Sequence, residues 1–240
     1  MKRIHRNKNK KISVITVVKN GIPYIEEAIK SYKSQNYSNK ELIVVYSKSN
    51  DQTLKVLKKF KKEKVINKLI IDKQSKNKYG SLNIGIKAAS GNIIGILHAD
   101  DLYPNKNVLK NIAKSFQNGH DILFGDIYFV KRDNVKITTR VWRESNFLPY
   151  KLYLGWMPPH TSTYIKSSIL KKFNYSNEFA IAADYSLMLF LFKKNYNFLH
   201  INKFLCKMRN GGTSTDIKYF YIKFKEEVRI TIRNFGILFI

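Results

Sequence analysis

The chain has 240 residues, of which 44% are hydrophobic and 13% aromatic, a composition that suits one large globular domain. No segment approaches the roughly 20 uninterrupted apolar residues of a membrane span, so none is predicted. The net charge of +27 favours anionic partners. However, its lysines are scattered and accompany no zinc-finger spacing or RNA-binding aromatic motif, so nucleic acid is not an expected partner.

The beginning of the chain resembles a signal peptide only superficially. Basic residues 1–11 precede an apolar run at residues 12–18, but Lys19 and Asn20 interrupt it and no small-residue cleavage site follows. The run is rich in β-branched residues, which favours a buried strand. The single cysteine, Cys206, excludes an intramolecular disulfide and suits a reducing compartment. We therefore expect a cytoplasmic protein.

Strand and helix signals alternate through the first half, which predicts a mostly parallel sheet flanked by helices. Apolar strands are expected at residues 12–18, 42–45, 69–71 and 93–97. Helices are expected near Pro23, after the capping residues 49–51, over residues 82–89 before Gly91, and from Pro104 or Lys106 onward.

The second half has shorter strand signals, at residues 127–130 and 136–141, which indicate a smaller and more antiparallel part. Helices are expected at residues 167–172, 182–194 and 217–233. We divide the chain into an α/β domain of residues 1–216 and a basic, aromatic helix within residues 217–240. That helix either packs on the domain or lies on an anionic membrane surface.

Two adjacent acids follow the strand at residues 93–97. Asp100 and Asp101 lie where open α/β sheets bind ligands, beyond the carboxyl ends of their strands. Adjacent carboxylates repel each other unless a cation or hydrogen bonds compensate, and carboxylate oxygens suit Mg²⁺ or Mn²⁺. The structural alternative is that Asp101 caps the turn before Pro104. The pair taken alone leaves both interpretations open.

The pair belongs to an ordered set of sequence blocks. They are Val18, Lys19 and Asn20 after the first strand; ELIVVYSKSNDQT at 41–53; Asn83, Gly85, Ala88 and Gly91; Pro159, His160 and Thr161; Ala183, Asp184 and Tyr185; and Arg209, Gly211, Gly212 and Ser214. In this order the blocks resemble the family 2 glycosyltransferases of the GT-A fold over nearly the whole chain.

The resemblance implies an inverting transfer from a nucleoside-diphosphate sugar to an acceptor hydroxyl. It assigns Mn²⁺ or Mg²⁺ to Asp100, with Asp101 beside it, and the role of catalytic base to Asp184, whose alternative is a helix cap. The implied donor-binding residues are Val18, Asn20, Tyr46, Ser47, Asp51, Asn83, His98 and Asp100. The implied acceptor-side residues are Trp156, His160 and Thr161.

Two residues depart from the family pattern. Tyr46 stands where an aspartate usually follows the second strand, and His98 takes the place of the first acid of the D-x-D motif. Tyr46 can stack on a base but cannot accept two ribose hydrogen bonds, so the donor nucleotide stays open. Asp51 either caps a helix or contacts nucleotide, and His160 either faces the acceptor or makes a structural hydrogen bond. Trp156, with Trp142, either stacks on sugar or packs in the core.

We therefore expect a metal-dependent glycosyltransferase in cell-surface polysaccharide or lipopolysaccharide synthesis. Its acceptor would be a glycan or lipid-linked glycan, reached at the inner face of an anionic membrane. The alternative is a degenerate nucleotide-sugar-binding protein without transferase activity, which Tyr46 and His98 motivate. A nucleotidyltransferase would need a Gly-rich basic loop after the first strand, and residues 19–22 hold only one glycine and one lysine.

Overall fold

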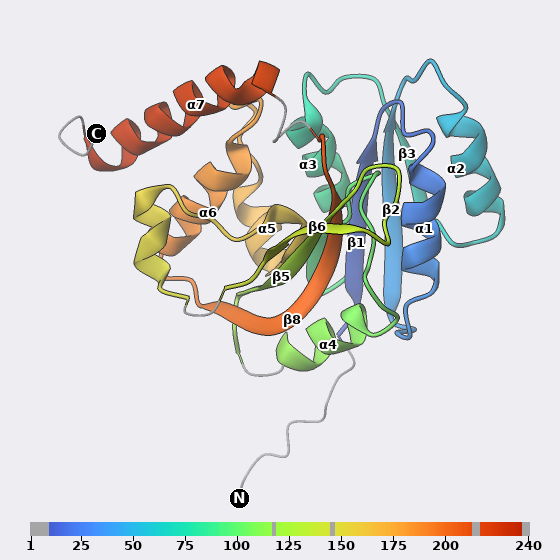
Figure 1. Cartoon of the computed structure of the whole chain (residues 1–240), viewed down its shortest axis with the longest axis horizontal. Coiled ribbons are helices and arrows are strands. Elements are labelled where there is room, and N and C mark those ends of the chain that lie inside the picture. Colours follow the sequence, from blue (N-terminus) through green and yellow to red (C-terminus); the bar gives the residue numbers. More distant parts are fainter. Residues whose placement is uncertain (1–9, 117–118, 145–146, 213–216, 237–240) are drawn as a thin grey trace, which may run out of the picture.

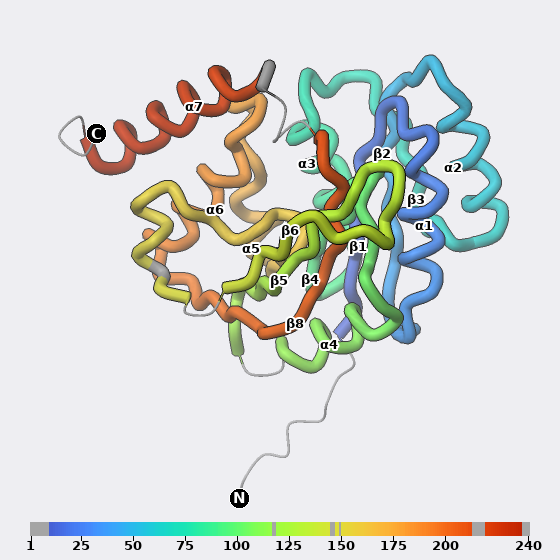
Figure 2. Tube along the Cα trace, viewed as in Figure 1, coloured from blue at the N-terminus to red at the C-terminus, as the bar shows by residue number. Residues whose placement is uncertain are grey.

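The structure is a computed structural model that describes residues 10–116, 119–144, 147–212 and 217–236. Its centre is an eight-stranded sheet of order β3-β2-β1-β4-β7-β5-β6, with β8 paired to β5. The strands are β1 (Ile12–Val18), β2 (Lys40–Ser47), β3 (Lys68–Asp72), β4 (Ile93–Ile96), β5 (Ile122–Val130), β6 (Thr138–Trp142), β7 (Thr163–Lys166) and β8 (Phe198–Arg209). Figures 1 and 2 show this sheet running through the molecule between its helices.

Helices cover both faces of the sheet, and each face has its own apolar cluster. One cluster includes side chains from α1 (Ile25–Lys33), α2 (Thr53–Lys62) and α4 (Val108–Ser115). The other includes side chains from α3 (Lys78–Ala88), α5 (Ser167–Phe173), α6 (Ala183–Lys193) and α7 (Ile217–Phe235). None of the helices within the described residues is long and apolar enough to cross a bilayer.

Strand β1 shows why the first half forms this layered arrangement. Val14 points into one apolar cluster and Ile15 into the other, as alternating side chains of a strand covered on both faces must. Helix α3 packs closely on β1, because a Cβ atom at Gly85 would lie only 2.6 Å from Cγ2 of Ile15. Strands β1 to β4 are parallel neighbours, so their carboxyl ends meet at one edge of the sheet.

The structure confirms the predicted α/β fold with a mixed, mostly parallel sheet, and it changes several boundaries. Helix α3 begins at Lys78, four residues before the prediction, because the side chain of Asn77 accepts the N–H groups of Tyr79 and Gly80. Helix α4 begins only at Val108. Strand β5 begins at residue 122 rather than 127. Ser214 and residues 237–240, which entered the sequence interpretation, lie outside the described residues.

Strands β7 and β8 were not predicted from the sequence. Strand β8 is largely half-buried, with Asn202 and Lys203 exposed at its centre, so it lacks a continuous apolar run. It pairs in parallel with β5 along most of that strand, while β6 and β7 pair with β5 in the antiparallel sense. The second half is therefore less antiparallel than its short strand signals indicated.

The buried carboxylate of Glu41 connects three segments of the chain: its own strand β2, the residues Lys11 and Ser13 around the start of β1, and Ser90. Its carboxylate accepts hydrogen bonds from the Ser13 hydroxyl at 2.5 Å and from the Ser90 N–H at 2.7 Å, and it pairs with Lys11 at 3.1 Å. Burial alone would raise the pKa of Glu41, but these hydrogen bonds outweigh it and lower that pKa from 4.5 to about 2. The ionised carboxylate therefore stabilises the fold at neutral pH.

We expect this stabilisation to be complete above pH 4.5 and to disappear as the pH falls towards 2, because the folded state holds the carboxylate ionised longer than the unfolded chain. Glu41→Gln should lower the free energy of unfolding at pH 7 by about 2 kcal/mol, the cost of disrupting a buried charged hydrogen-bond group. It should also flatten the stability profile between pH 5 and 2. Urea unfolding at several pH values measures both effects, and parallel profiles of the two proteins would contradict this role.

Candidate active site

The loops that follow β1 and β2 hold each other in place at the carboxyl edge of the sheet. The N–H of Asn20 donates to Oγ of Ser49 at 2.9 Å, and the N–H of Asn50 donates to Oδ1 of Asn20 at 2.9 Å. Asp51 accepts the N–H groups of Ile22 and Thr53, both at 3.0 Å. Hydrogen bonds, the one from the Thr53 side chain first among them, lower the pKa of Asp51. Asp51 therefore organises both loops.

The other donor-side residues differ in how far they are open to solvent. Val18 and Tyr46 are buried, Ser47 is half-buried, and Asn20 is exposed. The hydroxyl of Tyr46 accepts the N–H of Ser49 at 3.0 Å, and its ring belongs to the apolar cluster beside α1. With only 6% of Tyr46 exposed, its ring supports the loop and has no open face for stacking on a base.

Asp100 presents a partly exposed carboxylate directly after β4. The side chain is 28% exposed, and its Oδ2 lies 3.4 Å from Nη1 of Arg132. The Arg132 guanidinium also lies over the ring of Tyr24, 4.6 Å from its centroid. The guanidinium of Arg132 thus places a positive charge beside the carboxylate that the family resemblance assigns to the metal.

Asp101 faces the interior and has a different environment. It is 3% exposed, and its Oδ1 accepts the N–H of Arg209 at 3.2 Å. Burial, together with the neighbouring Asp100 carboxylate, raises the pKa of Asp101 well above its ordinary value. Asp101 therefore anchors the loop to β8, while Asp100 has the accessible carboxylate of the pair.

Arg209 organises this loop, and the sequence identified it only as part of the closing turn. Its side chain is 2% exposed, and it donates to the carbonyl oxygen of Asp100, to that of Arg132 at 3.1 Å and to the carboxylate of Glu27. The guanidinium also lies 4.7 Å from the centroid of the Tyr24 ring. One buried arginine thus connects three segments: the loop after β4 that bears Asp100 and Asp101 (the acid loop), the β5–β6 turn and helix α1.

Two histidines, His98 in the loop after β4 and His160, lie against each other. The ring of His98 meets that of His160 edge to face at 5.7 Å, and Nε2 of His160 lies 2.7 Å from the hydroxyl of Tyr175. Burial first, and then neighbouring positive charge, lowers the pKa of each histidine to about 3, so both are neutral at pH 7. Nε2 of His98 is buried and has no hydrogen-bond partner among the described residues. His160 makes the structural hydrogen bond that was one of its two alternatives.

Asp184 lies in the first turn of α6, partly exposed, with Tyr79 beside it. The hydroxyl of Tyr79 contacts Oδ1 of Asp184 at 3.0 Å and the carbonyl oxygen of Ile181. Burial and the Asp184 carboxylate raise the pKa of Tyr79 far above its ordinary value, so the phenol stays protonated as a donor. Tyr79 was not singled out from the sequence, because it precedes the predicted helix at residues 82–89 and belongs to none of the motif blocks.

Asn83 is placed differently from a donor-binding residue. Its amide nitrogen donates to the carbonyl oxygen of Tyr175 at 2.8 Å, and its amide oxygen accepts the N–H of Tyr175 at 2.9 Å. Both polar groups of Asn83 are thus engaged in fixing Tyr175, which in turn holds His160. The contacts of Asn83 are those of a structural residue.

The predicted acceptor-side residues lie beside β5. Thr161 is buried. Half-buried Trp156 stacks on Trp142 at 6.0 Å between ring centroids, and it meets Phe147 and Phe124 at 5.4 and 5.9 Å. Trp156 thus belongs to an aromatic cluster. That packing agrees with the core alternative for the two tryptophans.

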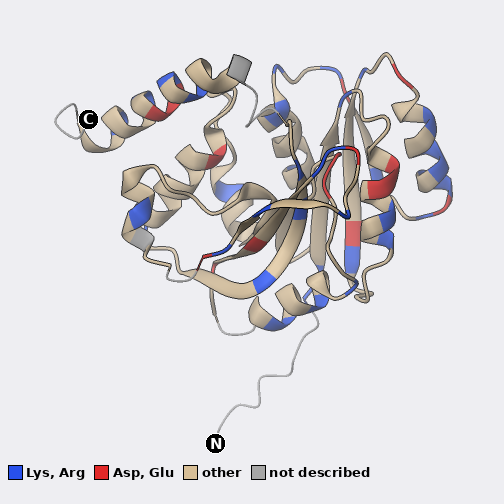
Figure 3. Cartoon of the chain, viewed as in Figure 1, with Lys and Arg blue, Asp and Glu red and all other residues tan. Residues whose placement is uncertain are grey.

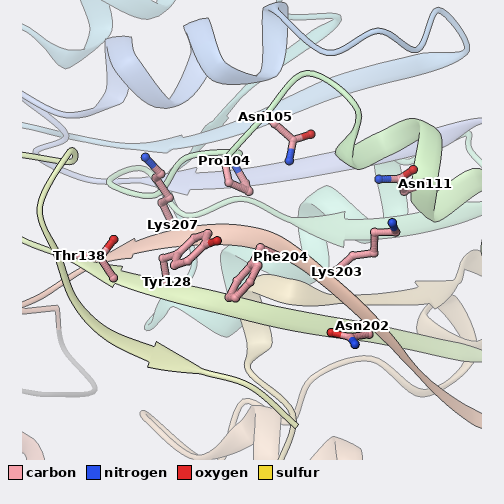
Figure 4. A pocket seen from close by; sticks show the side chains of 9 residues that line it. All are labelled: Pro104, Asn105, Asn111, Tyr128, Thr138, Asn202, Lys203, Phe204 and Lys207. Atoms are coloured by element: carbon pink, nitrogen blue, oxygen red, sulfur yellow. The ribbon is translucent and has the colours of Figure 1, made fainter. Parts of the chain in front are cut away.

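A separate pocket of about 530 Å³ opens between the loop before α4 and the strands β5, β6 and β8. Figure 4 shows its lining, in which the ring of Tyr128 stacks on that of Phe204 at 3.8 Å. None of the predicted metal, donor or acceptor residues lines it. The chemistry of the candidate site therefore lies elsewhere, at the carboxyl edge of the sheet.

The donor set at Asp100 fits one kind of metal site. Among the described residues no three His, Cys, Asp or Glu side chains gather in a way that would hold a metal alone. One accessible carboxylate at a strand end matches the binding of Mg²⁺ or Mn²⁺ through one or two protein oxygens, with water and substrate phosphates completing the shell. The residues thus fit a metal that binds together with a diphosphate.

Comparison with known proteins identifies the family. The model of the family described as "Glycosyl transferase family 2" matches residues 13–179. The chain belongs to glycosyl transferase family 2. This family 2 chain is 28% identical over 191 residues to an uncharacterised glycosyltransferase of Methanocaldococcus jannaschii. That match covers 78% of this chain and 66% of the relative, so the chain spans about two thirds of the relative's length.

Solved structures share the fold of this family 2 chain. S. aureus TarS superimposes with a TM-score of 0.71 at 20% identity, covering 93% of this chain and 39% of TarS. The glucosyl-3-phosphoglycerate synthase of Mycobacterium tuberculosis, in complex with Mn²⁺, UDP and phosphoglyceric acid, gives a TM-score of 0.68 at 15% identity, covering 95% of this chain and 79% of that chain. At these identities the likeness establishes the fold.

Substitution of Arg209 tests whether its side chain holds the acid loop in place. Arg209→Lys keeps the charge but loses the planar fork that reaches several acceptors, so we expect the free energy of unfolding to fall by about 2 kcal/mol. Arg132→Lys is the matched control, because its side chain is 42% exposed and should contribute less than about 1 kcal/mol. Urea denaturation of both variants measures the difference, and equal losses would contradict the assignment.

Proposed function

We propose that the protein transfers a sugar from a nucleoside-diphosphate sugar to an acceptor hydroxyl, with inversion at the anomeric carbon. The observation that carries the proposal is the family 2 match over residues 13–179, together with the accessible carboxylate of Asp100 at the carboxyl edge of the sheet. Burial lowers the pKa of His98, and the carboxylates of Asp100 and Asp184 act on the same ring in the opposite direction. Their common effect on His98 supports one shared site for the proposed metal ligand and the proposed catalytic base.

Asp184 is the proposed base. Its hydrogen bonds with the Tyr79 hydroxyl and the Tyr185 N–H both fall on Oδ1, and we assign Oδ2 to the proton of the acceptor. The acceptor oxygen forms the new bond to the anomeric carbon while the bond from that carbon to the diphosphate oxygen breaks. The electron pair leaves with the diphosphate, and the acceptor proton passes to Asp184.

Asp100 is the proposed metal ligand, with Asp101 fixing its loop. A bound Mn²⁺ or Mg²⁺ would supply positive charge that offsets the charge developing on the diphosphate. Support comes from the Mn²⁺ complexes of the mycobacterial synthase and of the Pyrobaculum calidifontis mannosyltransferase PcManGT. Arg132 adds a second positive charge beside Asp100. His98, whose buried Nε2 has no hydrogen-bond partner among the described residues, is proposed to contact the donor.

Two substitutions test the proposed chemistry. Asp184→Asn should lower kcat at least about 100-fold, because the amide cannot accept the acceptor proton. Asp100→Asn should cause a comparable loss and should weaken the dependence of donor binding on Mn²⁺. Exposed Asp133, mutated to Asn, is the matched control and should leave turnover unchanged.

A turnover screen with UDP-sugars and GDP-mannose provides the assay, since TarS and PcManGT are known in complex with UDP-GlcNAc and GDP-Man, respectively. The anomeric configuration of the product, measured by NMR, tests inversion. Wild-type turnover that survives in Asp184→Asn would rule out the assigned base.

The second candidate is a degenerate nucleotide-sugar-binding protein, which buried Tyr46 and neutral His98 favour. It would bind a donor without transferring sugar. Calorimetry with and without Mn²⁺, alongside the turnover screen, separates the two: metal-linked binding with no turnover for any donor favours the degenerate protein.

We further propose that the acceptor is a glycan or lipid-linked glycan of cell-surface polysaccharide or lipopolysaccharide synthesis, reached at the cytoplasmic face of an anionic membrane. The net charge of +27 supports this, as do the cationic helices visible in Figure 3. Helix α7 adds exposed aromatic side chains, of which Phe220 is 69%, Tyr221 63% and Phe224 55% exposed. Basic helices with exposed aromatic residues suit the membrane interface.

Vesicle flotation tests this contact. The protein should float with vesicles containing anionic phosphatidylglycerol and stay unbound with neutral phosphatidylcholine. Replacing Phe220, Tyr221 and Phe224 by serine should reduce binding at least about tenfold, because their apolar surface is lost. Replacing exposed Tyr150 and Leu154 by serine is the control, since both lie outside α7. Equal binding of all three proteins would refute a contact through α7.

A further inference from the structure

Helix α7 binds the backbone segment that leads to Asp184. The carboxylate of Glu226, in the middle of α7, accepts the N–H groups of Ala180 at 2.7 Å, Ile181 at 2.9 Å and Ala182 at 2.8 Å. Three successive amides thus converge on one side chain that comes from a distant part of the chain. Figure 1 shows α7 beyond α6, on the opposite side of the molecule from α2.

These hydrogen bonds fix the chain where it enters helix α6, which begins at Ala183. The first N–H groups of a helix have no partners within it, and a side chain just before the helix usually accepts them. Ala182 occupies that capping position and offers no side-chain acceptor. The Glu226 carboxylate instead binds the N–H of Ala182 and of the two residues before it, near the positive end of the helix dipole, where negative charge is favourable.

Tyr79 holds the same segment from α3. It is fully buried, and its hydroxyl contacts both the carbonyl oxygen of Ile181 and Oδ1 of Asp184. The N–H groups at residues 180–182 are thus bound by α7, while the carbonyl of residue 181 and the side chain of Asp184 are bound by α3. The backbone immediately before Asp184 is fixed on both of its polar sides.

We propose that Glu226 is a positioning residue that sets the orientation of Asp184 toward the acceptor. The inference rests on the proposed role of Asp184 as base. Glu226 acts through the backbone of residues 180–182, so its loss moves the carboxylate of Asp184 without removing any group that binds donor. Misplacement of a catalytic group by about 1 Å can cost about 100-fold in rate, so a small shift at this segment has a large effect.

Helix α7 also holds this region through a second, exposed set of contacts, which provides a matched control. Glu178 pairs with Arg229 at 2.5 Å and with Arg233 at 2.6 Å. Both glutamates join α7 to the segment before α6, and either can be replaced by glutamine. Only Glu226 binds the N–H groups next to Asp184.

The experiment compares Glu226→Gln, Glu226→Ala and Glu178→Gln. We expect kcat to fall at least about tenfold in Glu226→Ala, and less in Glu226→Gln, which keeps one acceptor oxygen. The KM for donor and the binding of UDP, measured by calorimetry, should stay within about twofold of wild type, because no donor contact is lost. Glu178→Gln should behave as wild type in all three measurements.

Hydrogen exchange provides a readout that needs no activity. The amides of residues 180–182 should exchange faster in Glu226→Ala at a temperature where the variant stays folded, and they should be unchanged in Glu178→Gln. Faster exchange with wild-type kcat would overturn the positioning role. Equal losses of kcat in Glu226→Ala and Glu178→Gln would overturn it as well, because general docking of α7 would then account for both. Absence of sugar transfer by the wild-type protein would instead count against the proposed function, which the exchange measurement does not test.

Discussion

The buried guanidinium of Arg209 holds the carboxyl edge of the sheet together. Its donors reach the backbone of Asp100 and of Arg132, and its own N–H binds Asp101. These contacts, together with the backbone pair of Leu102 and Lys207, connect the acid loop to β8. In this loop the Asp100 carboxylate is accessible while Asp101 stays inside. Asp100 and Asp101 thus both contact one residue, Asp100 through the Arg209 side chain and Asp101 through the Arg209 backbone N–H.

The sequence was sufficient to predict the first half of the fold. Long apolar runs such as residues 12–18 could only be strands covered on both faces, and the helices between them had clear caps or apolar periodicity. Strand β8 was missed because a half-buried strand with exposed polar residues at its centre, here Asn202 and Lys203, lacks that signal. Its parallel pairing with β5 depends on long-range contacts, which local patterns do not encode.

The candidate site could be predicted from the family resemblance as far as the roles assigned to Asp100 and Asp184, which stay predictions. It was not predictable where a residue acts through its surroundings. Tyr79 looks like a core aromatic and Glu226 like one charge among many on a basic helix, yet both bind the segment before Asp184. Asn83 shows the reverse case, since its place in a motif suggested ligand binding and its amide instead fixes Tyr175.

The position of Arg209 in the last strand also bears on how the protein is made. During synthesis the N-terminal end of the chain leaves the ribosome first, so early segments lack their contacts with segments that are made later. Strands β1 to β4 and the acid loop are complete long before β8 leaves the ribosome. Until then the loop bearing Asp100 lacks its hydrogen bond from Arg209. The segment before Asp184 likewise lacks its hydrogen bonds to Glu226 until α7 has been made. The nascent protein therefore contains Asp100 before the contacts that arrange its loop, which form only after β8 has been synthesised.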